Sequence, residues 1–136
     1  MTLPDSMIKN ADLTSQEYGW RIDVFPAILD EAVKNRLACI GGQFQFRGPI
    51  GTAEMYWLNA DSESKRPNES WVEYVARSCC EVKEHFNSSC NNIDFMAEAK
   101  RWDHIKKAIG EEGINPLEHL YFIAYFDEEG LKKPNQ

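Results

Sequence analysis

Two stretches decide the fold: Ala38-Cys-Ile-Gly-Gly-Gln-Phe-Gln-Phe46, and Leu120-Tyr-Phe-Ile-Ala-Tyr-Phe-Asp127 near the other end of the chain. In the first stretch two phenylalanines alternate with two glutamines, which is the period of a strand with one buried face. The second stretch is apolar almost throughout and rich in aromatic residues, which predicts a strand buried on both faces. A sheet with at least one covered face therefore forms the centre of the expected fold.

The residues after the first stretch predict an antiparallel hairpin. Arg47-Gly-Pro-Ile-Gly51 has the composition of a turn, and residues 53–59 read as a returning strand. The strand at 120–127 is expected beside this hairpin, in the middle of the sheet or as a well-covered member. The pair Gly41-Gly42 predicts a bulge or a close approach of two backbones.

Apolar residues spaced by three and four predict three helices, over residues 25–36, 69–86 and 94–109. Polar residues at 87–92 are expected to separate the last two helices. We expect residues 1–17 to form an irregular N-terminal arm and residues 128–136 to form a frayed tail.

The expected order is helix, strand, strand, helix, helix, strand, which predicts an α+β fold. Residues 1–136 form a single domain, because two domains in 136 residues would each be short of core. The prediction is a small, mostly antiparallel sheet packed by about three helices.

The chain is acidic, with 15 Lys and Arg against 22 Asp and Glu and a net charge of −7. A surface of this sign repels phosphate backbones, so we expect no direct binding of nucleic acid, whereas a basic protein partner would be attracted. No apolar run is long enough to span a membrane. The first 20 residues contain acidic residues and no apolar segment typical of a secretory signal, so we expect a cytoplasmic protein.

The sequence contains no phosphate-binding loop, nucleophile elbow or zinc-protease motif, so we expect no catalytic residue, cofactor or metal. Cys79, Cys80, His85 and Cys90 lie close together in the sequence, but on a helix their spacing does not bring them to one side. Any role of this cluster beyond packing is left open.

Two groups of side chains are candidates for a site. Alternation places polar side chains on one face of the predicted hairpin, which is either a binding or polar site or an exposed sheet face; these are Gln43, Gln45, Arg47, Glu54 and Tyr56. Carboxylates outside the predicted helix and strand cores are candidates for binding a partner; these are Asp61, Glu63, Glu111, Glu112, Asp127, Glu128 and Glu129. Because eight strand residues span about 26 Å, Glu111 and Glu112 are expected at the opposite end of the sheet from the 127–129 cluster.

Three stretches carry a resemblance to a known group of proteins: Gly41-Gly-Gln-Phe-Gln-Phe46, Glu54-Met-Tyr-Trp-Leu-Asn-Ala-Asp61 and Glu69-Ser-Trp-Val-Glu-Tyr-Val-Ala-Arg-Ser-Cys79. The chain resembles bacterial immunity proteins encoded beside polymorphic toxins and contact-dependent growth inhibition systems. The resemblance implies that the protein binds and neutralises a cognate toxin domain, such as a nuclease, in a stoichiometric complex. It assigns no individual residue a role.

Two other functions stay open. A small enzyme would use the polar hairpin face, with Glu54 as acid or base and Arg47 or Tyr56 orienting a substrate. A structural or regulatory subunit would pair through the edge of the hairpin or through an apolar face, for example as a homodimer.

Overall fold

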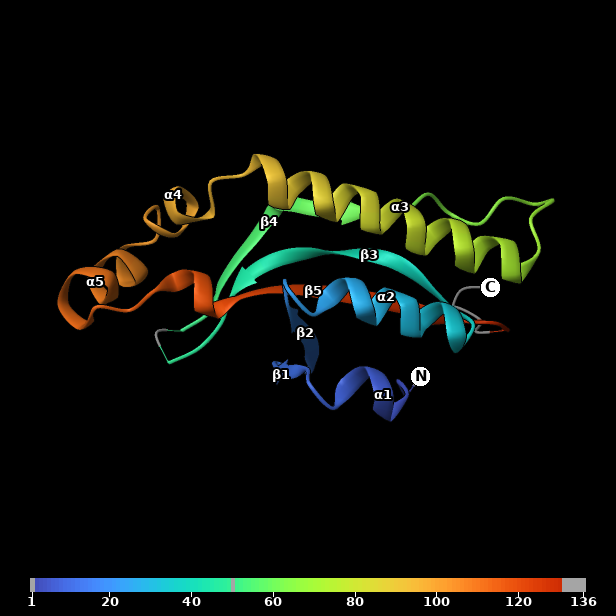
Figure 1. Ribbon diagram of the computed structural model, residues 1–136, viewed down its shortest axis with the longest axis horizontal. Coiled ribbons are helices and arrows are strands. Elements are labelled where there is room, and N and C mark those ends of the chain that lie inside the picture. The colour runs from blue at the N-terminus through green and yellow to red at the C-terminus, as the bar shows by residue number, and fades with distance from the viewer. Residues whose placement is uncertain (1, 50, 131–136) are drawn as a thin grey trace.

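The centre of the molecule is one antiparallel sheet of five strands, seen in a computed structural model that describes residues 2–49 and 51–130 (Figure 1). The spatial order of the strands is β1 (Asp12–Thr14), β2 (Glu17–Arg21), β5 (Leu120–Glu128), β3 (Leu37–Phe46) and β4 (Ala53–Asp61). The α+β fold predicted from the sequence is confirmed. The predicted hairpin is β3 and β4.

The apolar strand β5 lies in the middle of the sheet, between β2 and β3, as predicted. Its consecutive residues Phe122 and Ile123 point to opposite faces and are both completely buried. A continuous apolar run is the pattern that such a doubly covered strand requires.

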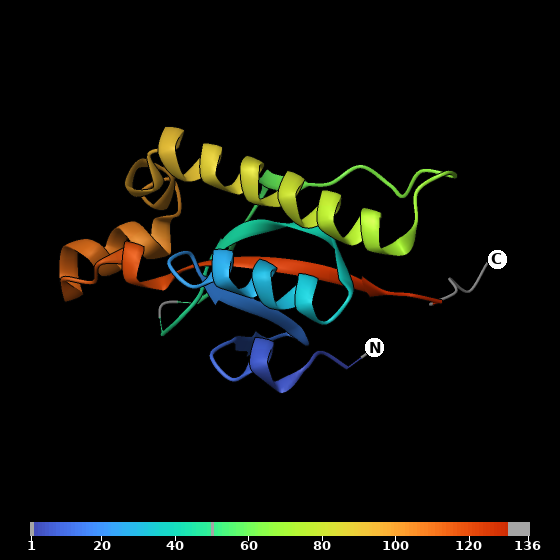
Figure 2. The same ribbon diagram turned by 45° about the vertical axis from the view of Figure 1, so that its right-hand side comes forward.

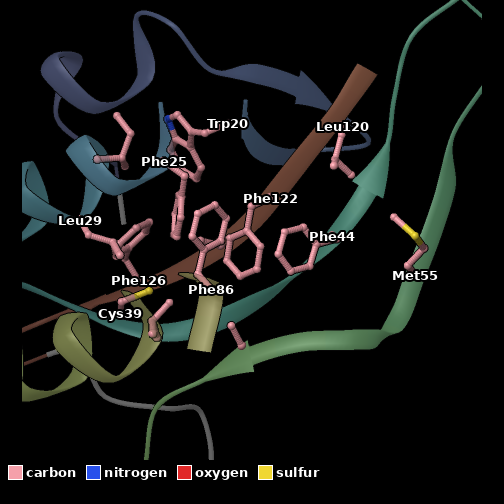
Figure 3. Packing of buried hydrophobic residues seen from close by; sticks show 14 of the residues in the cluster. Trp20, Phe25, Leu29, Cys39, Phe44, Met55, Phe86, Leu120, Phe122 and Phe126 are labelled. Atoms are coloured by element: carbon pink, nitrogen blue, oxygen red, sulfur yellow. The ribbon is translucent and has the colours of Figure 1, made fainter. Parts of the chain in front are cut away.

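Helices α2 (Phe25–Lys34) and α3 (Trp71–Asn92) cover one face of this sheet (Figures 1 and 2). Phe25 of α2 and Phe86 of α3 pack against each other, with ring centroids 5.0 Å apart. Both rings also contact Phe122 of β5, at 4.6 Å and 5.2 Å, and Phe44 of β3 completes the cluster (Figure 3). This aromatic core joins both helices to the two central strands.

Helix α3 is longer than predicted, because residues 87–92 continue it instead of separating two helices. Cys90 follows the buried Phe86 by one helical turn and packs against the core, so the buried stripe extends beyond the expected end. At the other end Ser70 and Glu73 form a capping box, which starts the helix at Trp71.

The helix predicted over residues 94–109 is two helices, α4 (Phe95–Ala99) and α5 (Asp103–Glu112). Between them Trp102 has an extended backbone, and its ring stacks on that of Trp57 of β4 at a centroid distance of 6.1 Å. This tertiary contact breaks a helix that the local pattern favours. A short 3₁₀ helix, η1 (Pro116–His119), then leads into β5.

The predicted irregular N-terminal arm is wrong, because these residues form α1 (Asp5–Ile8), β1 and the first residue of β2. Met7 is completely buried, and its carbonyl oxygen accepts a hydrogen bond of 2.7 Å from the indole nitrogen of Trp20. Of the expected frayed tail, Glu128 ends β5, whereas residues 131–136 lie outside the described residues.

Candidate protein-interaction site

A bulge in β3 opens a hollow in the sheet. The register of β3 against β5 shifts between Cys39 and Gly41, which confirms the bulge predicted from the glycine pair and leaves Ile40 41% exposed. The hollow has a volume of about 170 Å³ and is lined by residues 40–43 of β3, Asn59 and Asp61 of β4, and Tyr125 of β5. We call it the Gly41–Gly42 hollow.

Strand pairing brings these residues together from three parts of the chain. Gly41 pairs with Asp61 on one side and with Tyr125 on the other. Gly41 has a φ of 139°, and a side chain there would collide with the carboxylate of Asp61 and with the carbonyl of Ala60. Glycine is therefore required, and the Asp61 carboxylate lies in the space that a side chain at Gly41 would occupy.

Hydrogen bonds hold the end of β4 beside the hollow. The carbonyl oxygen of Asp61 accepts from Nδ1 of His85 in α3 at 2.9 Å. The next residue, Ser62, donates its hydroxyl to the carbonyl of Cys39 at 2.6 Å. The first bond uses the backbone of Asp61, and the carboxylate of Asp61 has no ion-pair partner within residues 2–49 and 51–130.

Tyr125 forms the other wall of the hollow. It lies between Ala124 and Phe126, which are buried in the core, so its ring points to the face away from the helices and is 42% exposed. Its hydroxyl donates to the carboxylate of Glu17. Partial burial, this hydrogen bond and the negative charges of Glu17 and Glu54 raise the pKa of Tyr125 to about 12. Carboxylates of β2 and β4 therefore act on the same face of the sheet.

The predicted polar hairpin face is only partly exposed. Gln45 and Arg47 are buried, at 1% and 2% exposure, so their expected place on an open face is corrected. Glu54 is exposed and pairs across the hairpin with Gln45. Tyr56 is 71% exposed, in a part of β4 where the pairing with β3 is interrupted, and it does not join Arg47 in a pocket.

Arg47 is buried because the N-terminal hairpin lies against it. Its Nη1 donates to the carbonyl oxygens of Asp12 and Glu17 at 3.0 Å and to the Asp12 carboxylate at 2.9 Å, and its Nε donates to Gln45 at 3.0 Å. In a flat sheet β1 would lie about 14 Å from β3, farther than an arginine side chain reaches. The sheet therefore curls towards this face, and Nη1 of Arg47 holds the N-terminal hairpin while its Nε holds Gln45 of β3.

The acidic candidates divide between the two ends of the molecule (Figure 1). Glu111 and Glu112 end α5, far from the end of β5 that carries residues 127–129. Asp61, the last residue of β4, lies near the end of the sheet that carries Asp127, because Asp61 pairs with Gly41 and Gly41 pairs with Tyr125. Glu63 follows Asp61 in the next loop. Two of the acidic candidates have ion-pair partners: Glu63 pairs with Arg66, and Glu129 pairs with Arg36.

An aromatic surface beside β4 was not predicted from the sequence. Tyr56 packs edge-on against Trp57, Trp57 stacks on Trp102, and the guanidinium of Arg101 lies 5.2 Å from the centre of the Trp57 ring. Ile40, Asn59, Glu17 and Tyr125 were also missed as parts of a site. Of the residues that line the hollow, the glycine pair, Gln43 and Asp61 were singled out from the sequence, whereas the others were missed because they meet through pairing of distant strands.

The cysteines do not have the character of reactive thiols. Burial raises the pKa of Cys39 well above its ordinary value, and it raises the pKa values of Cys79 and Cys90 to about 11. Cys80 is exposed, and the charge of Glu84 raises the pKa of its thiol. Among residues 2–49 and 51–130, no group of three or more His, Cys, Asp or Glu is placed to hold a metal ion.

Comparison with known proteins gives no match to a family model, a curated protein or a solved structure. No helix within the described part of the chain is both long and apolar enough to cross a membrane.

Proposed function

We propose that the protein is an immunity protein that binds a cognate bacterial toxin domain and neutralises it in a stoichiometric complex. The observation that carries this proposal is the Gly41–Gly42 hollow. It places two exposed apolar side chains, Ile40 and Tyr125, beside the carboxylate of Asp61. Apolar anchors with a charged rim are typical of protein interfaces.

The charge of the chain supports the same proposal. A net charge of −7 favours a basic partner, and long-range attraction speeds the encounter of two oppositely charged proteins. The resemblance to immunity proteins suggests the biological role, since it implies that a cognate toxin domain is bound and neutralised.

The geometry gives less support to a small enzyme. Arg47 is occupied by four hydrogen bonds and is buried, so it is not available to orient a substrate beside Glu54. Tyr56 is directed to solvent, and the buried thiols are held in the protonated form at neutral pH.

The experiment that tests the proposal starts from the gene next to the one that encodes this protein. The C-terminal domain of a large secreted protein encoded there is expressed in bacteria with and without this protein. We expect growth arrest by the domain alone, full growth on co-expression, and a 1:1 complex by light scattering. A toxic domain that this protein neither binds nor neutralises would contradict the proposal, as would a neighbourhood of metabolic genes with no such secreted protein.

One observation favours a second function, that of a structural or regulatory subunit. β4 is an edge strand of the sheet, and it carries the exposed Tyr56 and the partly exposed Trp57. An unpaired strand edge can add a strand from another chain. Light scattering of the isolated protein tests this function, for which a dimer that Tyr56→Lys and Trp57→Lys dissociate is expected.

A further inference from the structure

We propose that the Gly41–Gly42 hollow receives a single arginine side chain from the partner protein, an inference that rests on the proposed function and specifies its contact. The volume of about 170 Å³ is well below the roughly 300–1,000 Å³ of pockets for small molecules. The hollow therefore suits one side chain and is too small for a cofactor. It is open to solvent on the face away from α2 and α3.

The polar side chains of the hollow include three groups that can accept hydrogen bonds: one carboxylate and two amide oxygens. The Asp61 carboxylate has no ion-pair partner among the described residues. Asn59 donates its side-chain amide to the carbonyl of Tyr56 at 3.4 Å, which leaves its Oδ1 available as an acceptor. Gln43 adds a second amide oxygen on the neighbouring strand. A positively charged ligand with several donors matches this set.

The apolar groups of the hollow select arginine among the cationic side chains. A guanidinium is planar, carries five donors in a fixed arrangement and stacks on aromatic faces, whereas the lysine ammonium is a compact charge that is more strongly hydrated. Tyr125 presents an aromatic ring to the hollow, and Ile40 presents an aliphatic surface for the methylene groups. At Gly41 the space that a side chain would fill holds the Asp61 carboxylate.

The electrostatic surroundings act in the same direction. The carboxylates of Glu17 and Glu54 lie near enough to Tyr125 to act on its hydroxyl, so they add negative potential beside the hollow. The positive charge that faces Tyr125 is that of Arg47, which the Asp12 carboxylate neutralises at 2.9 Å. A cation entering the hollow therefore meets a negative field.

The test uses Nα-acetyl-arginine amide as the probe and Nα-acetyl-citrulline amide as its uncharged counterpart, each added to ¹⁵N-labelled protein. We expect saturable shifts of the backbone amides of Gly41 and Gly42 and of the side-chain amides of Asn59 and Gln43, with arginine and not with citrulline. Asp61→Asn should weaken arginine binding by about fivefold, the effect of losing a surface ion pair. Glu118→Gln, with the same change of charge at an exposed side chain of η1 near the opposite end of β5, should leave binding unchanged.

Equal shifts with citrulline, unchanged binding by Asp61→Asn, or no shift at these residues would overturn the inference. The amide spectrum of Asp61→Asn shows directly whether the variant is folded. The two proposals fail separately: a toxin complex that forms without any effect of Asp61→Asn rejects the arginine contact alone, whereas arginine binding without neutralisation rejects the toxin partner alone.

Discussion

The two faces of the sheet are built from the same strands but by different means. On the face under α2 and α3, aromatic rings fill the space, and the cluster of Phe25, Phe44, Phe86 and Phe122 excludes water without any polar group (Figure 3). On the opposite face none of the helices in the described part of the chain covers the strands. There the side chain of Arg47 extends towards β1 and β2. Its hydrogen bonds, rather than apolar packing, hold these two strands.

The difference shows how a sheet can be covered by helices on one face and accessible to a binding partner on the other. Apolar packing is not directional, so it covers a wide area and leaves nothing exposed. A hydrogen-bonded arginine fixes one end of the open face and leaves the other end free. The Gly41–Gly42 hollow, Tyr125 and Asp61 lie in that free part.

The largest effect on stability is expected from a substitution in the core under the helices. Phe122→Ala removes a completely buried ring that contacts three other rings, and it should lower the free energy of unfolding by about 3–5 kcal/mol. Urea denaturation followed by circular dichroism measures this change. Tyr56→Ala, at a side chain that is 71% exposed, is the control and should change stability by no more than about 0.5 kcal/mol. Equal losses in the two variants would show that the aromatic cluster is not the core.

A smaller effect on stability is expected from a substitution on the face that the helices do not cover. Arg47→Met removes the hydrogen bonds that hold the N-terminal hairpin, and it should cost about 2–3 kcal/mol, since the Asp12 carboxylate left behind is partly exposed. Hydrogen exchange should show that β1 and β2 lose protection before β3 and β5. Arg36→Met breaks the exposed pair with Glu129 and should cost less than about 1 kcal/mol. Uniform loss of protection across the sheet would contradict the local role of Arg47.

The smallest effect concerns the ionisation of Tyr125. Its pKa of about 12 lies above that of a free tyrosine, near 10, so the folded protein keeps this hydroxyl protonated where the unfolded chain ionises it. This contribution to stability is complete below pH 10 and is lost as the pH rises towards 12. Ultraviolet titration should show a late tyrosine phase that is diminished in Tyr125→Phe, since burial also raises the pKa of Tyr74, and that moves to lower pH in Glu17→Gln. A phase unaffected by Glu17→Gln would show that the hydrogen bond has no part in the shift.

Much of the fold could be predicted from local patterns, because burial on one face leaves a period in the sequence. The alternation in residues 38–46 predicted β3, and the apolar run at 120–127 predicted β5 as a buried strand beside the hairpin, either central or well covered; the structure places it in the middle. The prediction failed where a distant contact outweighed the local pattern. Stacking of Trp102 on Trp57 divides α4 from α5, and the burial of Met7 and Trp20 organises residues that look like an irregular arm.

The candidate site was the less predictable part. Carboxylates such as Asp61 were identified by their charge, but nothing near them in the sequence indicated that Tyr125 would be a neighbour. Gln45 and Arg47 were placed on the correct face, since Arg47 binds Gln45, but their burial depends on β1 and β2. Polar residues in a strand give the same alternation whether water or another hairpin covers them.

The sequence by itself determined the strands of the hairpin, the buried central strand, the helix-covered face and the acidic charge of the chain. These properties depend on residue type and on spacing within a few turns or strand residues. Only the tertiary structure decided that the N-terminal hairpin closes over Arg47 and that Gly41, Asp61 and Tyr125 form one hollow. The reason is physical: strand register and sheet curvature bring together residues that are distant along the chain, and no local period records such contacts.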